Sequence, residues 1–164
     1  MPPVILRSNS PGRTRRIGFS LGHFAQAGDV FLLSGDLGTG KTCITQGIAK
    51  GLGVEGYVRS PTFVLLSIHS GRLPLYHVDI YRLDHVAEVQ DLGLEEYLAG
   101  DGVSVIEWAD KALEVFPKSC LRIMLDFNGE KERLIKLEPY GKRYEQLVLQ
   151  ASSELEKSGT QIRL

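Results

Sequence analysis

The stretch Gly35-Asp36-Leu37-Gly38-Thr39-Gly40-Lys41-Thr42 decides the fold, because it fits GxxxxGK[ST], the pattern of a phosphate-binding P-loop. The apolar run at residues 30–33 before it is typical of a buried parallel strand, and residues 43–52 after it carry apolar side chains at helical spacing. Glycines let successive backbone N–H groups turn toward an anion, and the helix N-terminus adds partial positive charge. Within this loop Lys41 can reach the outer phosphates, and the Thr42 hydroxyl can bind Mg²⁺. The stretch therefore predicts a nucleotide site in an α/β domain.

Two acids stand where such a site needs a carboxylate, at the ends of neighbouring apolar strands. Residues 103–107 form the cleaner strand pattern and end in Glu107, and residues 75–79 end in Asp79. In an open α/β sheet both acids would border the ligand crevice. One would bind metal through water while the other orients the attacking water, and the sequence alone leaves the assignment open. A loop acid or a helix cap is the alternative for either.

Three weaker candidates accompany the acids. The loop Ser60-Pro61-Thr62 lies where a hydroxyl could sense the terminal phosphate, although an ordinary turn fits it equally well. His77 is read as a core histidine on the strand that ends in Asp79. Trp108 adjoins Glu107, where core packing and a nucleotide contact are both open.

Length and composition indicate one ordinary globular domain. The chain has 164 residues, of which 43% are hydrophobic and 24% charged, with a formal net charge of −1 that argues against broad nucleic-acid binding. Its two cysteines match no metal spacing, so we expect a reduced, cytoplasmic protein. Four arginines and no acid in residues 1–16 could mark a transit peptide, but a strand at 4–6 and a turn at Ser10-Pro11-Gly12 fit better. We expect a single domain at 1–157 and a flexible C-terminal tail at 158–164.

The remaining elements follow from periodicity and turn residues. The pattern predicts a helix over 14–26 capped by Thr14, and a helix over 140–155. It also predicts hairpins formed by 63–69 with 73–78 and by 120–127 with 133–137, short helices over 84–97 broken at Gly93, and a short helix or loop over 109–116. The predicted fold class is α/β: a P-loop NTPase-like mixed β-sheet flanked by helices, with antiparallel hairpins added to a parallel core.

Four motifs in this order resemble one family. They are the P-loop with its preceding Ser34, then Ser60-Pro61-Thr62-Phe63, Tyr76-His77-Val78-Asp79-Ile80-Tyr81-Arg82-Leu83 and Ile106-Glu107-Trp108. Together they resemble the TsaE (YjeE) family, the bacterial ATPase subunit of the machinery that makes threonylcarbamoyladenosine in tRNA. The resemblance covers roughly residues 14–137.

The resemblance implies a small Mg²⁺-dependent ATPase that is weak alone and stimulated by two partner proteins of the TsaB and TsaD type. These partners transfer a threonylcarbamoyl group to the adenosine beside the tRNA anticodon, and ATP hydrolysis resets the complex. By position, the resemblance makes Lys41, Asp79 and Glu107 catalytic, and Thr42 and Glu107 metal ligands. It assigns the following residues to nucleotide binding: Thr14, Gly38, Thr39, Gly40, Lys41, Thr42, Cys43, Thr62, Trp108 and Arg133.

Cys43 departs from the family pattern, in which a hydroxyl residue is common at that position. A thiol at a helix N-terminus beside a nucleotide is expected to favour the thiolate. We therefore expect ATP to slow alkylation of Cys43.

Two other function classes remain as alternatives. A small-molecule kinase would need an acceptor pocket and usually an Arg-rich lid, and the candidate lid at 84–97 is acidic and has no Arg. A nucleotide-dependent binding switch would need the site but not hydrolysis. The sequence shows no guanine-reading signal, and the preference for ATP comes from the resemblance.

Overall fold

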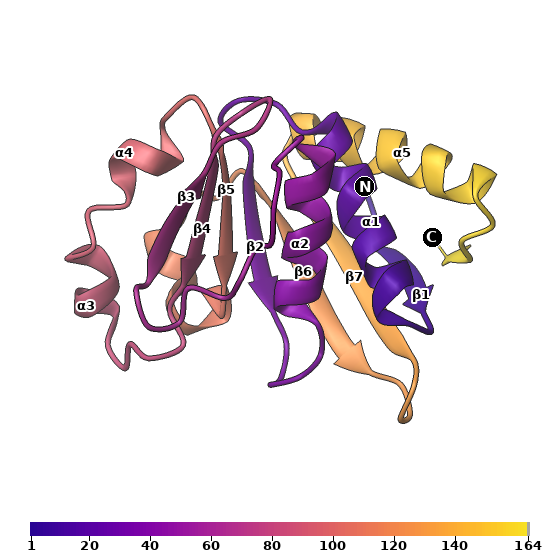
Figure 1. Cartoon of the computed structure of the whole chain (residues 1–164), viewed down its shortest axis with the longest axis horizontal. Helices are drawn as coiled ribbons and strands as arrows, with labels where there is room; N and C mark the ends of the chain where they lie inside the picture. Colours follow the sequence, from indigo (N-terminus) through magenta and orange to yellow (C-terminus); the bar gives the residue numbers. More distant parts are fainter. Residues whose placement is uncertain (164) are drawn as a thin grey trace.

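All eight strands of the computed structural model, which describes residues 1–163, form one sheet (Figure 1). The strand order is β3-β4-β5-β2-β6-β7-β1-β8. The central strands β4, β5, β2 and β6 run parallel, and the pairs β3–β4, β6–β7, β7–β1 and β1–β8 are antiparallel. This mixed sheet with a parallel core and added hairpins confirms the predicted fold class. No helix in the described residues is long and apolar enough to cross a membrane.

The elements follow one another as strands and helices of ordinary length. Their bounds are β1 (Val4–Ser8), α1 (Pro11–Phe24), β2 (Val30–Ser34), α2 (Lys41–Gly51), β3 (Leu66–His69), β4 (Leu75–Asp79), α3 (Val86–Gln90), α4 (Glu95–Leu98), β5 (Val103–Glu107), η1 (Ala109–Val115), β6 (Cys120–Phe127), β7 (Arg133–Tyr140), α5 (Lys142–Lys157) and β8 (Ile162–Arg163).

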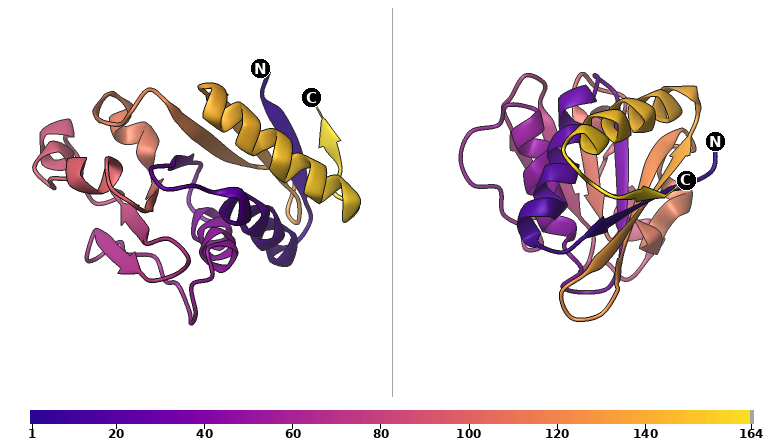
Figure 2. Two further views of the ribbon diagram at one scale, coloured as in Figure 1. Left: turned by 90° about the horizontal axis from the view of Figure 1, so that it is seen from above. Right: turned by 90° about the vertical axis from the view of Figure 1, so that its right-hand side faces the viewer.

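Helices cover both faces of the sheet (Figure 2), and each face has its own apolar core. On one face α1, α2 and α5 pack on alternate residues of the strands, among them Phe31 and Leu33. On the other face α3, α4 and η1 pack on the residues between, among them Leu32 and Ile106. Strand β2 is therefore buried on both faces, which is why its sequence reads as a continuous apolar run.

Helix α1 begins three residues earlier than its apolar pattern indicates. We expected a turn at Ser10-Pro11-Gly12 and a cap at Thr14, but Ser10 is the N-cap and Pro11 opens the helix. The Ser10 hydroxyl accepts a hydrogen bond from the Arg13 backbone N–H at 3.1 Å. Proline is favoured at a first helical position because its fixed φ suits the helix and its missing N–H would have no partner there.

Two further segments differ from the sequence prediction. Strand β3 begins only at Leu66, because residues 63–65 turn back on Pro61 and Leu65 adopts a φ of +67°. At the C-terminus, where a flexible tail was expected, Ile162 pairs with Leu6 of β1 and packs against the core. Leu164, the last residue of that predicted tail, lies outside the described residues.

Helices α1 and α2 approach closely through glycines. A Cβ added at Gly18 or Gly22 would lie 2.2 Å from a backbone oxygen of α2, at Ile44 or Ile48. A Cβ added at Gly47 or Gly51 would likewise lie 2.1 or 2.3 Å from a backbone oxygen of α1. Side chains would hold the two backbones apart, so this contact fixes α1 against the helix that follows the P-loop.

Candidate functional site

The P-loop joins β2 to α2 at the carboxyl edge of the parallel strands, where β4 and β5 also end. Gly35 and Gly40 have φ of +143° and +109°, a region that side chains rarely adopt, and a Cβ at Gly35 would lie 2.4 Å from the Leu125 carbonyl oxygen. A cavity of about 440 Å³ opens beside the loop, lined by residues of the P-loop, of the loop after α2 and of the ends of β4 and β5. The predicted strand–loop–helix context is confirmed.

Lys41 is held by the loop to which it belongs. Its Nζ donates hydrogen bonds to the carbonyl oxygens of Gly35 and Asp36. The ammonium also lies 3.8 Å from the centre of the Trp108 ring. Burial lowers the pKa of Lys41, and the nearby carboxylates of Glu107 and others oppose that shift.

Glu107 links the P-loop to β4. One carboxylate oxygen, Oε1, accepts a hydrogen bond from the Thr42 hydroxyl at 2.9 Å, and the other, Oε2, contacts Nε2 of His77. Glu107 is 2% exposed and His77 is fully buried. The sequence places Glu107 here because it ends β5 directly opposite Asp79 in the parallel register.

Asp79 meets the loop that was predicted to sense phosphate. Its Oδ2 accepts hydrogen bonds from the hydroxyls of Ser60 at 2.9 Å and Thr62 at 3.0 Å, and its Oδ1 accepts one from the Tyr81 backbone N–H. The Ser60-Pro61-Thr62 loop is therefore not an ordinary turn alone. It is tied to a buried acid on the edge of the cavity.

The oxygen donors fit Mg²⁺. A hydroxyl and a carboxylate 2.9 Å apart are hard ligands of the kind that this ion prefers. Within residues 1–163 no three His, Cys, Asp or Glu side chains cluster closely enough to hold a metal by themselves. Mg²⁺ is usually bound by one or two protein oxygens together with phosphates and water, so the pair Thr42–Glu107 suits a metal that arrives with a nucleotide.

Trp108 closes one side of this cavity. Its backbone adopts the left-handed conformation, with φ of +63° and ψ of +28°, between β5 and η1. The indole stacks at a tilt with Tyr81, with ring centres 4.7 Å apart. Trp108 therefore serves both as packing and as a wall of the cavity beside Lys41.

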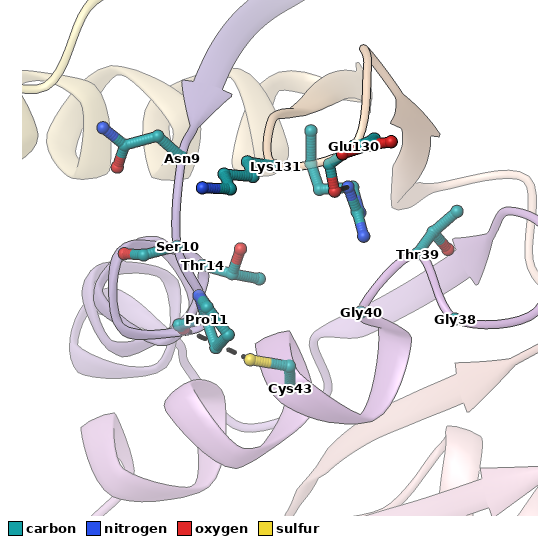
Figure 3. A pocket seen from close by; sticks show the side chains of 11 residues that line it. Asn9, Ser10, Pro11, Thr14, Gly38, Thr39, Gly40, Cys43, Glu130 and Lys131 are labelled. Atoms are coloured by element: carbon teal, nitrogen blue, oxygen red, sulfur yellow. Dashed lines mark hydrogen bonds between the residues drawn. The ribbon is translucent and has the colours of Figure 1, made fainter.

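A second cavity, of about 500 Å³, lies on the other side of the P-loop (Figure 3). The start of α1, the P-loop and the β6–β7 hairpin surround it, with Thr14, Cys43 and Arg133 in its lining. Gly38, Gly40 and Cys43 line both cavities. The residues predicted for nucleotide binding thus divide between two adjoining spaces that share the P-loop as a wall.

The thiol of Cys43 differs from the expectation. Burial raises its pKa, and the Arg15 guanidinium, whose Nη1 lies 3.7 Å from Sγ, only partly offsets this. The thiol donates to the Pro11 carbonyl oxygen at 3.3 Å. The expected preference for thiolate is therefore wrong here, because desolvation of the thiol outweighs the effect of the Arg15 guanidinium.

Every predicted site residue lies at one of the two cavities. Thr39 is buried behind the loop, with its hydroxyl on the Asp36 carbonyl. Sequence reasoning missed the contact of His77 with Glu107, although the alternation of β4 puts His77 and Asp79 on one face. It also missed Ser10, Pro11, Glu130 and Lys131 as lining residues of the second cavity.

Comparison with known proteins decides the family. The family model described as Threonylcarbamoyl adenosine biosynthesis protein TsaE matches residues 8–135. The chain belongs to the TsaE family. This confirms the resemblance of the four motifs, and with the P-loop it implies a nucleotide-binding protein of ATPase type.

Curated relatives in the TsaE family match over most of their length. A tRNA threonylcarbamoyladenosine biosynthesis protein TsaE of Bacillus subtilis is 44% identical over 142 residues, which cover 86% of this chain and 89% of the relative. The TsaE protein of Treponema pallidum is 41% identical over 127 residues, covering 75% and 94%. The crystal structure of Bacillus subtilis YdiB superposes with a TM-score of 0.83 at 38% identity, covering 93% of this chain and 96% of that one.

Proposed function

We propose that this TsaE-family chain is the ATP-hydrolysing subunit required for threonylcarbamoyl modification of the adenosine next to the tRNA anticodon. In this proposal it acts in the cytoplasm with two partner proteins, of the TsaB and TsaD type, and reaches tRNA only through the complex. Hydrolysis resets the complex between turnovers. The observation that carries the proposal is the pair of buried acids that face the P-loop, Glu107 on Thr42 and Asp79 on the Ser60-Pro61-Thr62 loop.

The site residues divide the chemistry among them. Lys41 keeps two N–H groups on loop carbonyls and has a third for the outer phosphates, and Thr42 with Glu107 would provide the oxygens for Mg²⁺. The metal, when bound, neutralises charge that develops between the outer phosphates. Asp79 takes its place beside the terminal phosphate and orients the attacking water.

The contacts of the Ser60-Pro61-Thr62 loop support weak activity of the isolated chain. The Ser60 and Thr62 hydroxyls are engaged by Asp79, so they are not free to contact a phosphate. Phe63, which lines the cavity, and its neighbour Val64 are 81% and 67% exposed, so they form an apolar pair that a partner could cover. A partner protein that covers this loop would reposition the hydroxyls and raise the rate.

Steady-state phosphate release tests the proposal. The isolated chain should hydrolyse ATP slowly, and the rate should rise when both partner proteins and tRNA are present. Glu107→Gln and Asp79→Asn should lower the stimulated rate by about a hundredfold or more. Glu138→Gln, which alters a carboxylate paired with Lys136 on the sheet, is the matched control and should keep the rate.

Two outcomes would count against the proposal. No stimulation by the partners would remove the role within a complex. If tRNA modification survived in Glu107→Gln while hydrolysis was lost, the chain would be a binding switch in which hydrolysis is incidental.

A further inference from the structure

We propose that His77 is a positioning residue, which holds the carboxylate of Glu107 in the orientation that binds Mg²⁺. The inference rests on the proposed function only in taking Glu107 as the metal acid. It assigns a role to a fully buried side chain that the motifs leave as core packing.

The geometry divides the two oxygens of Glu107 between two partners. Oε1 faces the P-loop and accepts from Thr42, and Oε2 faces β4 and contacts Nε2 of His77. A carboxylate only accepts, so the proton of the imidazole lies on Nε2. The Thr42 hydroxyl and Oε1 are the oxygens that would hold Mg²⁺ or its water, and His77 would keep its contact with Oε2.

The contact with Glu107 is the single hydrogen bond of the His77 side chain within the described part of the chain. Its Nδ1 is buried and finds no partner there. A buried polar atom without a partner costs about 1–3 kcal/mol. An apolar residue would fill the position more cheaply, so packing alone does not account for a histidine here.

Strand β4 ties both halves of the site together. His77 and Asp79 are two residues apart, so they lie on the same face of the strand, and β5 presents Glu107 alongside. His77 fixes the metal acid, while Asp79 binds the Ser60-Pro61-Thr62 loop. A single rigid strand thereby sets the distance between the metal and the loop, as outer-sphere partners do in other metal sites.

Two amide substitutions separate this role from packing. In His77→Gln the amide nitrogen lies as many bonds from Cα as Nε2 does, so it can donate to Glu107. In His77→Asn the amide nitrogen takes the place of Nδ1 and falls short. His77→Ala removes the donor entirely. Tyr144→Phe, a loss of a buried hydrogen bond at the first residue of β2, the end of that strand remote from the P-loop, controls for reduced stability.

The readout is the coupling between metal and nucleotide, not hydrolysis. Calorimetric titration gives the affinity of a non-hydrolysable ATP analogue with excess Mg²⁺ and with EDTA, and the ratio of the two measures the coupling. We expect His77→Gln and Tyr144→Phe to keep the wild-type ratio. His77→Asn and His77→Ala should lower it about tenfold or more, with little change in EDTA.

Three patterns among the variants overturn the inference. It falls if all three His77 variants keep the ratio, if His77→Gln loses as much as His77→Asn, or if Tyr144→Phe loses coupling in step with its melting temperature. A wild-type ratio near one would remove the Mg²⁺ site together with the inference. Strong wild-type coupling without ATP hydrolysis in the complex would sink the proposed function and leave the role of His77 intact.

Discussion

Replacing Gly18 by alanine should push α1 away from α2. The added Cβ would lie 2.2 Å from the Ile44 carbonyl oxygen, 3.0 Å from the Ile48 nitrogen and 3.1 Å from the Gly47 Cα. All three are backbone atoms, which cannot rotate aside as a side chain can. The helices must therefore separate by about 1 Å, in an interior packed as densely as a crystal.

The magnitude follows from two opposing effects. Overpacking of this kind costs about 3 kcal/mol, the upper end of the usual range, because backbone atoms must move. Alanine has a higher helix propensity than glycine, which stabilises the folded chain by about 1 kcal/mol. The net loss of about 2 kcal/mol corresponds to a melting temperature lower by about 4–8 °C for a chain of this size.

Thermal unfolding by circular dichroism measures this loss, and Gly12→Ala is the matched control. Gly12 is also in α1, but a Cβ there meets nothing closer than the Ser10 hydroxyl at 3.8 Å. Gly12→Ala should be neutral or slightly stabilising. Nucleotide affinity should also fall in Gly18→Ala, because the start of α1 lines the second cavity (Figure 3). A melting temperature for Gly18→Ala equal to or above that of wild type would refute the reasoning.

Three further changes test other parts of the structure. Tyr144→Phe leaves the buried Val30 N–H without its acceptor and should lower stability by about 1–3 kcal/mol in denaturant titration. Burial raises the pKa of Tyr144 to about 12 from 10.0, so the stability that the neutral phenol contributes is present below pH 10 and is lost as pH rises toward 12. Between pH 10 and 12 the free energy of unfolding should therefore fall more steeply for wild type than for Tyr144→Phe, and equal falls would contradict this. Alkylation of Cys43 should be slow at neutral pH, because burial raises its pKa, and slower still with nucleotide; equal labelling rates with and without ATP would count against its place at the cavity. Asp79→Ala removes the acceptor of both hydroxyls and should free the Ser60-Pro61-Thr62 loop, seen as faster proteolysis at that loop. Unchanged cleavage would show that the two hydrogen bonds do not restrain it.

The sequence predicts the parts of the fold and site that rest on local pattern. The P-loop between an apolar run and a helical stripe, and the acids at the ends of residues 75–79 and 103–107, are adjacent in the chain to the elements that place them. The parallel register then brings Asp79 opposite Glu107 without further information. These features were therefore within reach of periodicity and strand-end chemistry.

One difference is local, because Ser10-Pro11 suits both a turn and a helix start. The others depend on contacts between distant segments. The glycines of α1 and α2 become meaningful only when the helices meet, and β8 is too short to show a pattern before it pairs with β1. Desolvation of Cys43 likewise arises from the fold around it, which is why its local setting misled the prediction.

The hold of the P-loop on its own lysine fixes the position of a positive charge before any ligand is bound. The Lys41 ammonium is engaged by two carbonyl oxygens of the loop and by the Trp108 ring. An ammonium has three N–H donors, so one remains for a phosphate oxygen. Fixing a lysine side chain costs about 1.5–2 kcal/mol of rotamer freedom, and here that cost is met when the chain folds and not when a nucleotide binds.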